Sequence, residues 1–158
     1  MRYPRLLRIL VGVLTLATVT LVAPTPAQAA SRCSTGSATV YSPTGGVGAT
    51  ASARVCINDK YRPTLDTSRY NYVKDQKADG YAARAWFRYY DTWYGYWATS
   101  GPFVADDTST STGAEIPNYG WPVENVDQAE VWVCLGMARP GYGSEDRCSI
   151  VAYVEYYE

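Results

Sequence analysis

The densest group of residues suited to ligand contact lies between Tyr81 and Trp97. Aromatic rings carry much of the energy of cores and interfaces, and Trp, Tyr and Arg dominate contact hot spots. An exposed set of these side chains would stack on the faces of sugar rings or anchor a protein partner. The rings of this stretch are Tyr81, Trp86, Phe87, Tyr89, Tyr90, Trp93, Tyr94, Tyr96 and Trp97. The candidate binding residues are Arg84, Trp86, Arg88, Tyr90, Trp93, Tyr94 and Trp97.

A purely structural interpretation of the same stretch is also open. Side chains alternate between the two faces of a strand, so half of these rings should face the core. Arg84 and Arg88 would then only cover apolar surface with their stems. So many rings cannot all be buried in a small domain, and a contiguous exposed remainder would mark a contact surface. Asp91 to Trp97 breaks the alternation, so Trp93, Tyr94 and Trp97 are the better contact candidates.

Catalytic chemistry is restricted by the absence of histidine from the chain. This excludes Ser-His-Asp and Cys-His catalysis and most catalytic zinc sites. Paired carboxylates, as in glycoside hydrolysis, remain as an option. Glu130 stands between apolar neighbours, where partial burial would suit an acid to proton transfer. We interpret it as an acid facing solvent at a strand end, and we expect no catalytic residue, no cofactor and no metal site.

The N-terminal segment has the three parts of a secretory signal peptide. Arg2, Arg5 and Arg8 precede an uncharged apolar run, and a small-residue site ends at Ala29. We therefore expect residues 1–29 to be removed and 30–158 to form one domain that is secreted, extracellular and not membrane-bound. Without the three arginines, eleven basic residues face fifteen acidic ones, a formal charge of −4. This argues against nucleic acid, whose binding rests on cationic contacts. We also expect a monomer.

The four cysteines are Cys33, Cys56, Cys134 and Cys148. An even number in an exported chain indicates disulfides, and three connectivities are possible. We favour Cys33–Cys56 and Cys134–Cys148, because each pair would link neighbouring strands. A zinc site is disfavoured because no two cysteines are close in the sequence.

Alternation and turn residues predict a chain of short strands. Residues 58–80 show no lasting period and are expected to form a long surface loop, and Gly101-Pro102 is expected to end a strand. In the C-terminal hairpin, pairing Cys134 with Cys148 would place Trp132 opposite Ile150 and Glu130 opposite Ala152. The expected strands are 37–42, 49–57, 81–90, 96–100, 112–116, 129–137 and 147–157. Such a set predicts an all-β, antiparallel β-sandwich, with a small β-barrel as the alternative.

Several short motifs resemble those of uncharacterised small secreted proteins of actinobacteria. They are Val55-Cys56, the 77–80 turn, the arginine-aromatic strand 81–90 and the cysteine hairpin with Asp146 before Cys148. The segment from Lys60 to Tyr72 looks like an insertion relative to that pattern. The resemblance implies a disulfide-linked β-sandwich and no catalytic residues.

Three functions from different classes remain open. The first is a non-catalytic module that binds an extracellular polysaccharide or protein surface. The second is a secreted inhibitor of an amylase or protease. The run from Trp86 to Tyr89 resembles the Trp-Arg-Tyr triplet of small α-amylase inhibitors, although Phe87 interrupts it and the cysteine spacing differs. The third is a small glycoside hydrolase that uses two carboxylates.

Overall fold

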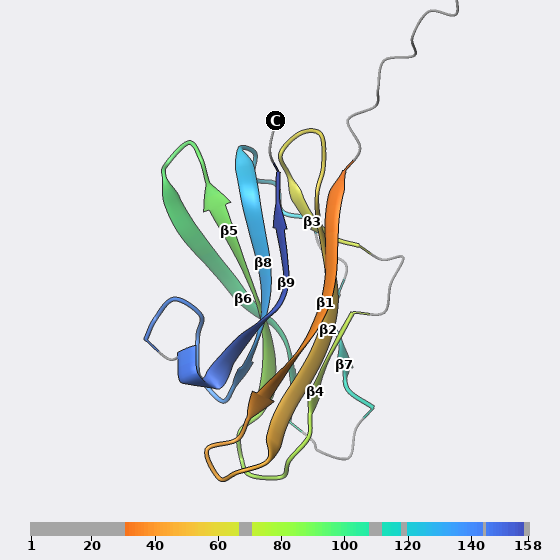
Figure 1. Cartoon of the computed structure of the whole chain (residues 1–158), viewed down its shortest axis with the longest axis vertical. Helices are drawn as coiled ribbons and strands as arrows, with labels where there is room; N and C mark the ends of the chain where they lie inside the picture. The colour runs from red at the N-terminus through yellow and green to blue at the C-terminus, as the bar shows by residue number, and fades with distance from the viewer. Residues whose placement is uncertain (1–30, 67–70, 108–111, 118–119, 144, 157–158) are drawn as a thin grey trace, which may run out of the picture.

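Two antiparallel sheets packed face to face make up the chain in the computed structural model (Figure 1). The structure describes residues 31–66, 71–107, 112–117, 120–143 and 145–156. The predicted signal segment, 1–29, lies outside the described residues. Because the strand pairing gives two separate sheets, the predicted β-sandwich is confirmed over the alternative of a barrel.

The first sheet has the strand order β1-β2-β4-β7, and β3 pairs with the other end of β2. A tight turn at Gly45 and Gly46, both with positive φ, joins β1 to β2. The strands are β1 (Arg32–Tyr41), β2 (Val47–Ile57), β3 (Pro63–Leu65), β4 (Tyr72–Asp75) and β7 (Ala114–Glu115).

The second sheet has the order β6-β5-β8-β9. Most of the aromatic stretch lies on β5 and β6, at one edge of this sheet. A short 3-10 turn, η1 (Glu145–Arg147), lies just before its last strand. The strands are β5 (Ala83–Asp91), β6 (Tyr96–Asp106), β8 (Val126–Leu135) and β9 (Cys148–Glu155).

The core lies between the sheets and follows the predicted alternation. On β2, the side chains of Ala51, Ala53, Val55 and Ile57 are buried, as expected from their period of two. On β5, Ala83, Ala85 and Phe87 form the inner face. The Phe87 ring stacks on Trp121, with ring centroids 3.6 Å apart.

The two predicted disulfides are confirmed. Cys33 lies opposite Cys56 in the β1–β2 register, and Cys134 lies opposite Cys148 in the β8–β9 register. Each bond therefore joins directly neighbouring strands. The first sheet and the second sheet receive one such link each.

Two segment predictions are wrong. Residues 58–80, expected as an irregular loop, contain β3 and β4, and β4 lies between β2 and β7. These strands are only three and four residues long, too short to show a period. Gly101-Pro102 does not end β6. The register shifts there instead, from Ala85 opposite Val104 to Phe87 opposite Ser100.

The register of the C-terminal hairpin is partly as predicted. Trp132 lies opposite Ile150, but an irregularity between Val131 and Trp132 places Glu130 opposite Tyr153 instead of Ala152. A bulge inserts an extra residue on one strand and changes every pairing beyond it. None of the helical segments in the described ranges is long and apolar enough to cross a membrane.

Candidate functional site

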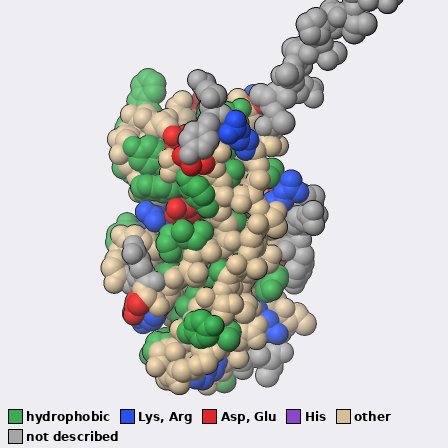
Figure 2. All heavy atoms as spheres, in the orientation of Figure 1, with side chains coloured by type: hydrophobic (Ala, Val, Ile, Leu, Met, Phe, Trp, Pro, Cys, Tyr) green, Lys and Arg blue, Asp and Glu red, His purple; other side chains and the backbone are tan. Residues whose placement is uncertain are grey.

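The two most exposed rings of the described residues lie at the turn between β5 and β6, and a third exposed ring follows them. Trp93, Tyr94 and Tyr96 are 76%, 70% and 52% exposed, and we call these three residues the aromatic tip. The rings of Tyr94 and Tyr96 lie 6.0 Å apart. Figure 2 shows hydrophobic side chains gathered over this end of the molecule. Large exposed rings in one place are unusual on a small protein and indicate a contact surface.

The turn that carries the aromatic tip is held by Asp91. Its carboxylate Oδ1 accepts hydrogen bonds from the backbone amides of Trp93 (2.9 Å) and Tyr94 (3.1 Å). Its carbonyl accepts a third from the amide of Gly95, at 2.8 Å. A short aspartate side chain that caps its own turn in this way is a common turn device. The tip is therefore ordered by local bonds and not by burial of its rings.

Next to the tip, on the outer face of the second sheet, an arginine side chain lies against two tryptophan rings. The Arg88 guanidinium lies over Trp97 (4.8 Å to the centroid) and Trp132 (5.7 Å). It also pairs with Glu130, whose Oε2 lies 3.4 Å from Nη1. The same oxygen accepts a hydrogen bond of 2.7 Å from the Trp132 indole N–H. We call Arg88, Trp97, Glu130 and Trp132 the arginine–aromatic cluster.

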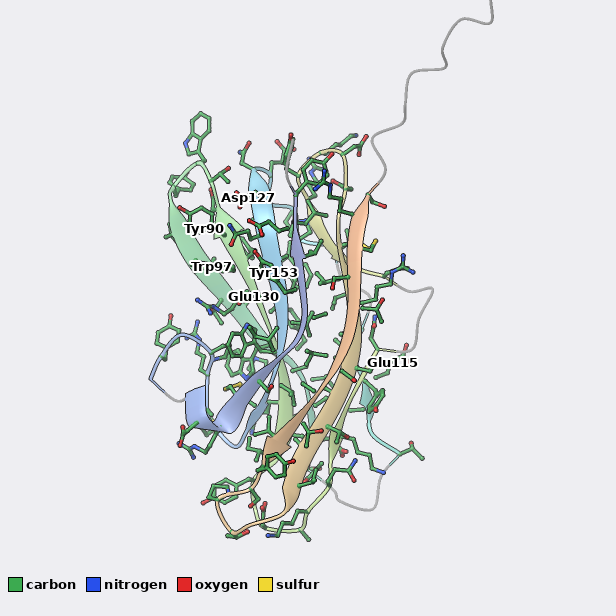
Figure 3. The ribbon with its side chains drawn as sticks, in the orientation of Figure 1. Tyr90, Trp97, Glu115, Asp127, Glu130 and Tyr153 are labelled. Atoms are coloured by element: carbon green, nitrogen blue, oxygen red, sulfur yellow. A yellow bond between two sulfur atoms is a disulfide. The ribbon has the colours of Figure 1, made fainter. Side chains whose placement is uncertain are left out.

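Figure 3 shows where this cluster lies relative to neighbouring rings. Tyr90 and Trp97, from β5 and β6, lie close to Glu130 and Tyr153 of β8 and β9. Tyr90 and Trp97 are half-buried, with centroids 5.7 Å apart. Tyr90 therefore lies between Trp97 of the cluster and the turn that carries the tip, where its hydroxyl is close to Gly95.

The part of this outer face around Trp86 is covered by the β8–β9 loop. Trp86 is only 7% exposed and packs with Trp132, Cys134 and Ala138 in a small second core. The Arg139 guanidinium lies 5.6 Å from the Trp86 ring centroid. Trp86 was expected on an exposed surface, and that expectation is wrong. The strand period placed it correctly on the outer face, but a loop fifty residues away in the chain closes over it.

The predicted binding residues thus fall into four groups. Trp93 and Tyr94 are exposed on the tip, and Tyr90 and Trp97 are half-buried beside it. Arg88 is engaged by the cluster, and its side chain is only 16% exposed. The others are Trp86, which is covered, and Arg84, which is half-buried and lies opposite Cys134 on β8.

Two residues of the site were not among the candidate binding residues, although Tyr96 is a ring of the 81–97 stretch at the expected start of a strand. Tyr96 belongs to the exposed tip because it starts β6 at the turn. Asn125 lies next to the turn because its carbonyl accepts hydrogen bonds from the amide (2.9 Å) and the hydroxyl (2.7 Å) of Thr92. Asn125 also has a positive φ of 65°, a conformation in which asparagine is enriched among non-glycine residues.

The carboxylates of the described residues are mostly in structural roles. Glu130, expected to face solvent, is buried between Arg88 and Trp132, so that expectation is wrong. Asp75 and Asp106 are both buried, and Asp106 accepts a hydrogen bond from the Asp75 amide. Burial raises the pKa of Asp75, and the nearby Asp79, Asp106 and Asp107 add to the rise. Burial also raises the pKa of Asp127.

Within the described ranges, one group of three side chains places potential metal-ligating atoms close together: Cys33, Cys56 and Asp66. Both cysteine sulfurs are joined in a disulfide. A metal needs the thiolate form of cysteine, which this bond removes. The group therefore does not fit a metal site.

The fold and the site define a disulfide-linked antiparallel β-sandwich that presents an aromatic hairpin turn. Comparison with protein-family models, with curated proteins and with solved structures gives no match for the chain. The similarity to small secreted actinobacterial proteins stays a prediction.

Proposed function

We propose that the chain is an exported, non-catalytic binding module that holds an extracellular ligand through its aromatic tip. The observation that carries this proposal is the exposure of Trp93 and Tyr94 on a turn ordered by Asp91. Rings of this kind bury much area on contact and are the usual hot-spot residues. A turn that is already ordered loses little conformational entropy when it binds.

Several other features support export and binding. Two disulfides are typical of oxidising compartments, and the predicted signal segment would direct the chain there. The carboxylate nearest the exposed rings, Asp91, is used for turn bonds, and Glu130 is used for an ion pair. Both carboxylates therefore stabilise the structure through these contacts, which favours binding over carboxylate catalysis on this face.

Retention on insoluble polysaccharides and on bacterial cell-wall fractions tests the proposal. We expect the wild type to be retained and Trp93→Ala to weaken retention by roughly tenfold or more, since loss of a hot-spot ring costs about 2 kcal/mol. Tyr94→Ala should act in the same direction. The matched control is Tyr41→Ala, because Tyr41 is equally exposed, at 68%, but ends β1 at the opposite end of the sandwich (Figure 1).

Equal retention of the wild type, Trp93→Ala and Tyr41→Ala would show that the aromatic tip does not bind. Failure of the wild type to bind any of these surfaces would also count against the proposal. Folding of each variant is checked by its unfolding midpoint, which should not change because the tip rings are exposed.

A secreted hydrolase inhibitor is the second candidate, and the shape of the tip favours it. The β5–β6 turn projects from the end of the second sheet (Figure 1). A projecting, pre-ordered loop suits insertion into an enzyme cleft. Assays of amylases and proteases with the purified protein test this candidate. Inhibition that Trp93→Ala relieves would support it, and no inhibition of any enzyme in the panel would remove it.

A further inference from the structure

A shallow groove runs beside the aromatic tip, between the β5–β6 turn and the segment that leads into β8. Its volume is about 400 Å³, within the usual size range of small-ligand sites. Its lining residues are Asp91, Trp93, Tyr94, Val123, Glu124 and Asn125.

Hydrogen bonds join the two walls of this groove. Thr92, on the turn, donates from its amide and its hydroxyl to the Asn125 carbonyl on the other wall. The next amide along, that of Val126, donates to the Tyr61 carbonyl at 3.0 Å. The groove therefore exists before any ligand arrives, which reduces the entropic cost of binding.

Both carboxylates that line the groove, those of Asp91 and Glu124, already have partners within the chain. The Asp91 carboxylate is buried and accepts two backbone amides. Glu124 forms an ion pair with Arg62, so its charge has a partner within the chain. A cationic ligand would have to break these contacts, and an anionic ligand would meet two carboxylates. The groove thus favours an uncharged ligand.

The groups that remain for a ligand are two rings and one amide. Trp93 and Tyr94 are exposed. Asn125 is exposed as well, and its bonds with Thr92 use its backbone carbonyl and not its side-chain amide. An amide both donates and accepts, which matches a hydroxyl-rich ligand, and flat rings match the C–H faces of sugars. We propose that this groove binds a neutral carbohydrate, with a sugar ring on Trp93 or Tyr94 and its hydroxyls on Asn125. This inference rests on the proposed binding function and names its ligand class.

The closing experiment uses soluble, uncharged oligosaccharides as probes. Hexaoses of β-1,4-glucose, xylose, mannose and N-acetylglucosamine are titrated into the full chain by calorimetry and by tryptophan fluorescence. We expect saturable binding of at least one probe. Asn125→Gly should weaken it about tenfold, because one or two hydrogen bonds of about 1 kcal/mol each are lost.

The glycine variant isolates the amide from the backbone. Glycine adopts positive φ without strain, and the bonds from Thr92 go to the carbonyl at position 125, which the variant keeps. The free energy of unfolding should therefore change little. Trp93→Ala should also lose binding, and Tyr41→Ala should keep it.

A parallel measurement separates this inference from the proposed function. Cell-wall fractions are offered to the wild type before and after digestion of their proteins with a protease. Retention that survives digestion, together with binding of a hexaose that Asn125→Gly weakens, supports the carbohydrate. Retention that needs Trp93 but is lost on digestion, with no hexaose bound, overturns it in favour of a protein ligand and leaves the binding function standing. Absence of both retention and hexaose binding overturns both.

Discussion

Replacing Glu130 by alanine tests whether one buried carboxylate holds the arginine–aromatic cluster together. The Glu130 side chain is 10% exposed and the Arg88 side chain 16% exposed, so water screens their attraction poorly. The alanine variant removes the ion pair and the acceptor of the Trp132 indole N–H at once. Breaking a buried pair from one side costs about 3–5 kcal/mol, because it leaves an uncompensated charge.

We expect a value near the lower end of that range for Glu130→Ala, about 3 kcal/mol. The rings of Trp97 and Trp132 still lie against the guanidinium and continue to attract it. For a chain of this size, such a loss lowers the midpoint of thermal unfolding by roughly 10 °C. Denaturant unfolding with both disulfides intact measures the free energy directly.

The matched control is Glu124→Ala. Glu124 also pairs with an arginine, but its side chain is 58% exposed and that of Arg62 is 42% exposed. An exposed pair of this kind contributes about 0–1 kcal/mol. A loss for Glu130→Ala within about 0.5 kcal/mol of the loss for Glu124→Ala would refute the reasoning, since burial is the difference between them. The double variant Arg88→Met with Glu130→Met should be more stable than Glu130→Ala, because it leaves no unpaired charge.

Two further predictions concern packing and pH. A Cβ added at Gly36 would lie 2.0 Å from the Val151 carbonyl oxygen, so Gly36→Ala should destabilise the fold by about 3 kcal/mol in denaturant unfolding. Burial raises the pKa of Asp75 above its ordinary value of 3.8. The folded state thus disfavours its ionised form, and this cost is present above the raised pKa and absent below 3.8. Asp75→Asn should therefore stabilise the protein at neutral pH, and the gain should fade as the pH is lowered through that range.

Each of these two predictions has a direct check. Gly120→Ala is the control for Gly36, because the nearest atom to its added Cβ is 3.7 Å away; equal losses for the two variants would contradict the close approach of β1 to β9. For Asp75→Asn, unfolding free energies are compared at neutral and acid pH. A change that is the same at both would show that ionisation of Asp75 does not carry the effect.

Much of the fold could be predicted because it rests on local patterns. The period of two in Ala51, Ala53, Val55 and Ile57 identifies a buried strand face, and the structure buries all four. The even cysteine count, in a chain whose N-terminal segment predicts export, indicated disulfides, and pairing across neighbouring strands is confirmed. The short strands β3 and β4 were not predicted. With three and four residues they show no alternation, so residues 58–80 were expected to form a loop.

The candidate site could be predicted only in part, because its composition depends on segments far apart in the chain. The broken alternation after Asp91 singled out Trp93, Tyr94 and Trp97; the structure exposes the first two, but Trp97 is half-buried under Arg88. Asn125 was missed because its place beside the turn depends on hydrogen bonds to Thr92, thirty-three residues away. The register shift in the C-terminal hairpin, which placed Tyr153 opposite Glu130, likewise has no local signal.

The sequence by itself determined the class of this protein: strands from alternation, turns from glycine and proline, two disulfides from four cysteines, and a ring-rich hairpin. Only the tertiary structure decided which of those rings a ligand can reach. Alternation assigns Trp86 and Tyr90 to the same outer face, yet the β8–β9 loop with Ala138 and Arg139 covers the first and leaves the second half-exposed. The physical reason is that a strand's period selects a face, whereas burial of that face depends on which distant segment packs against it.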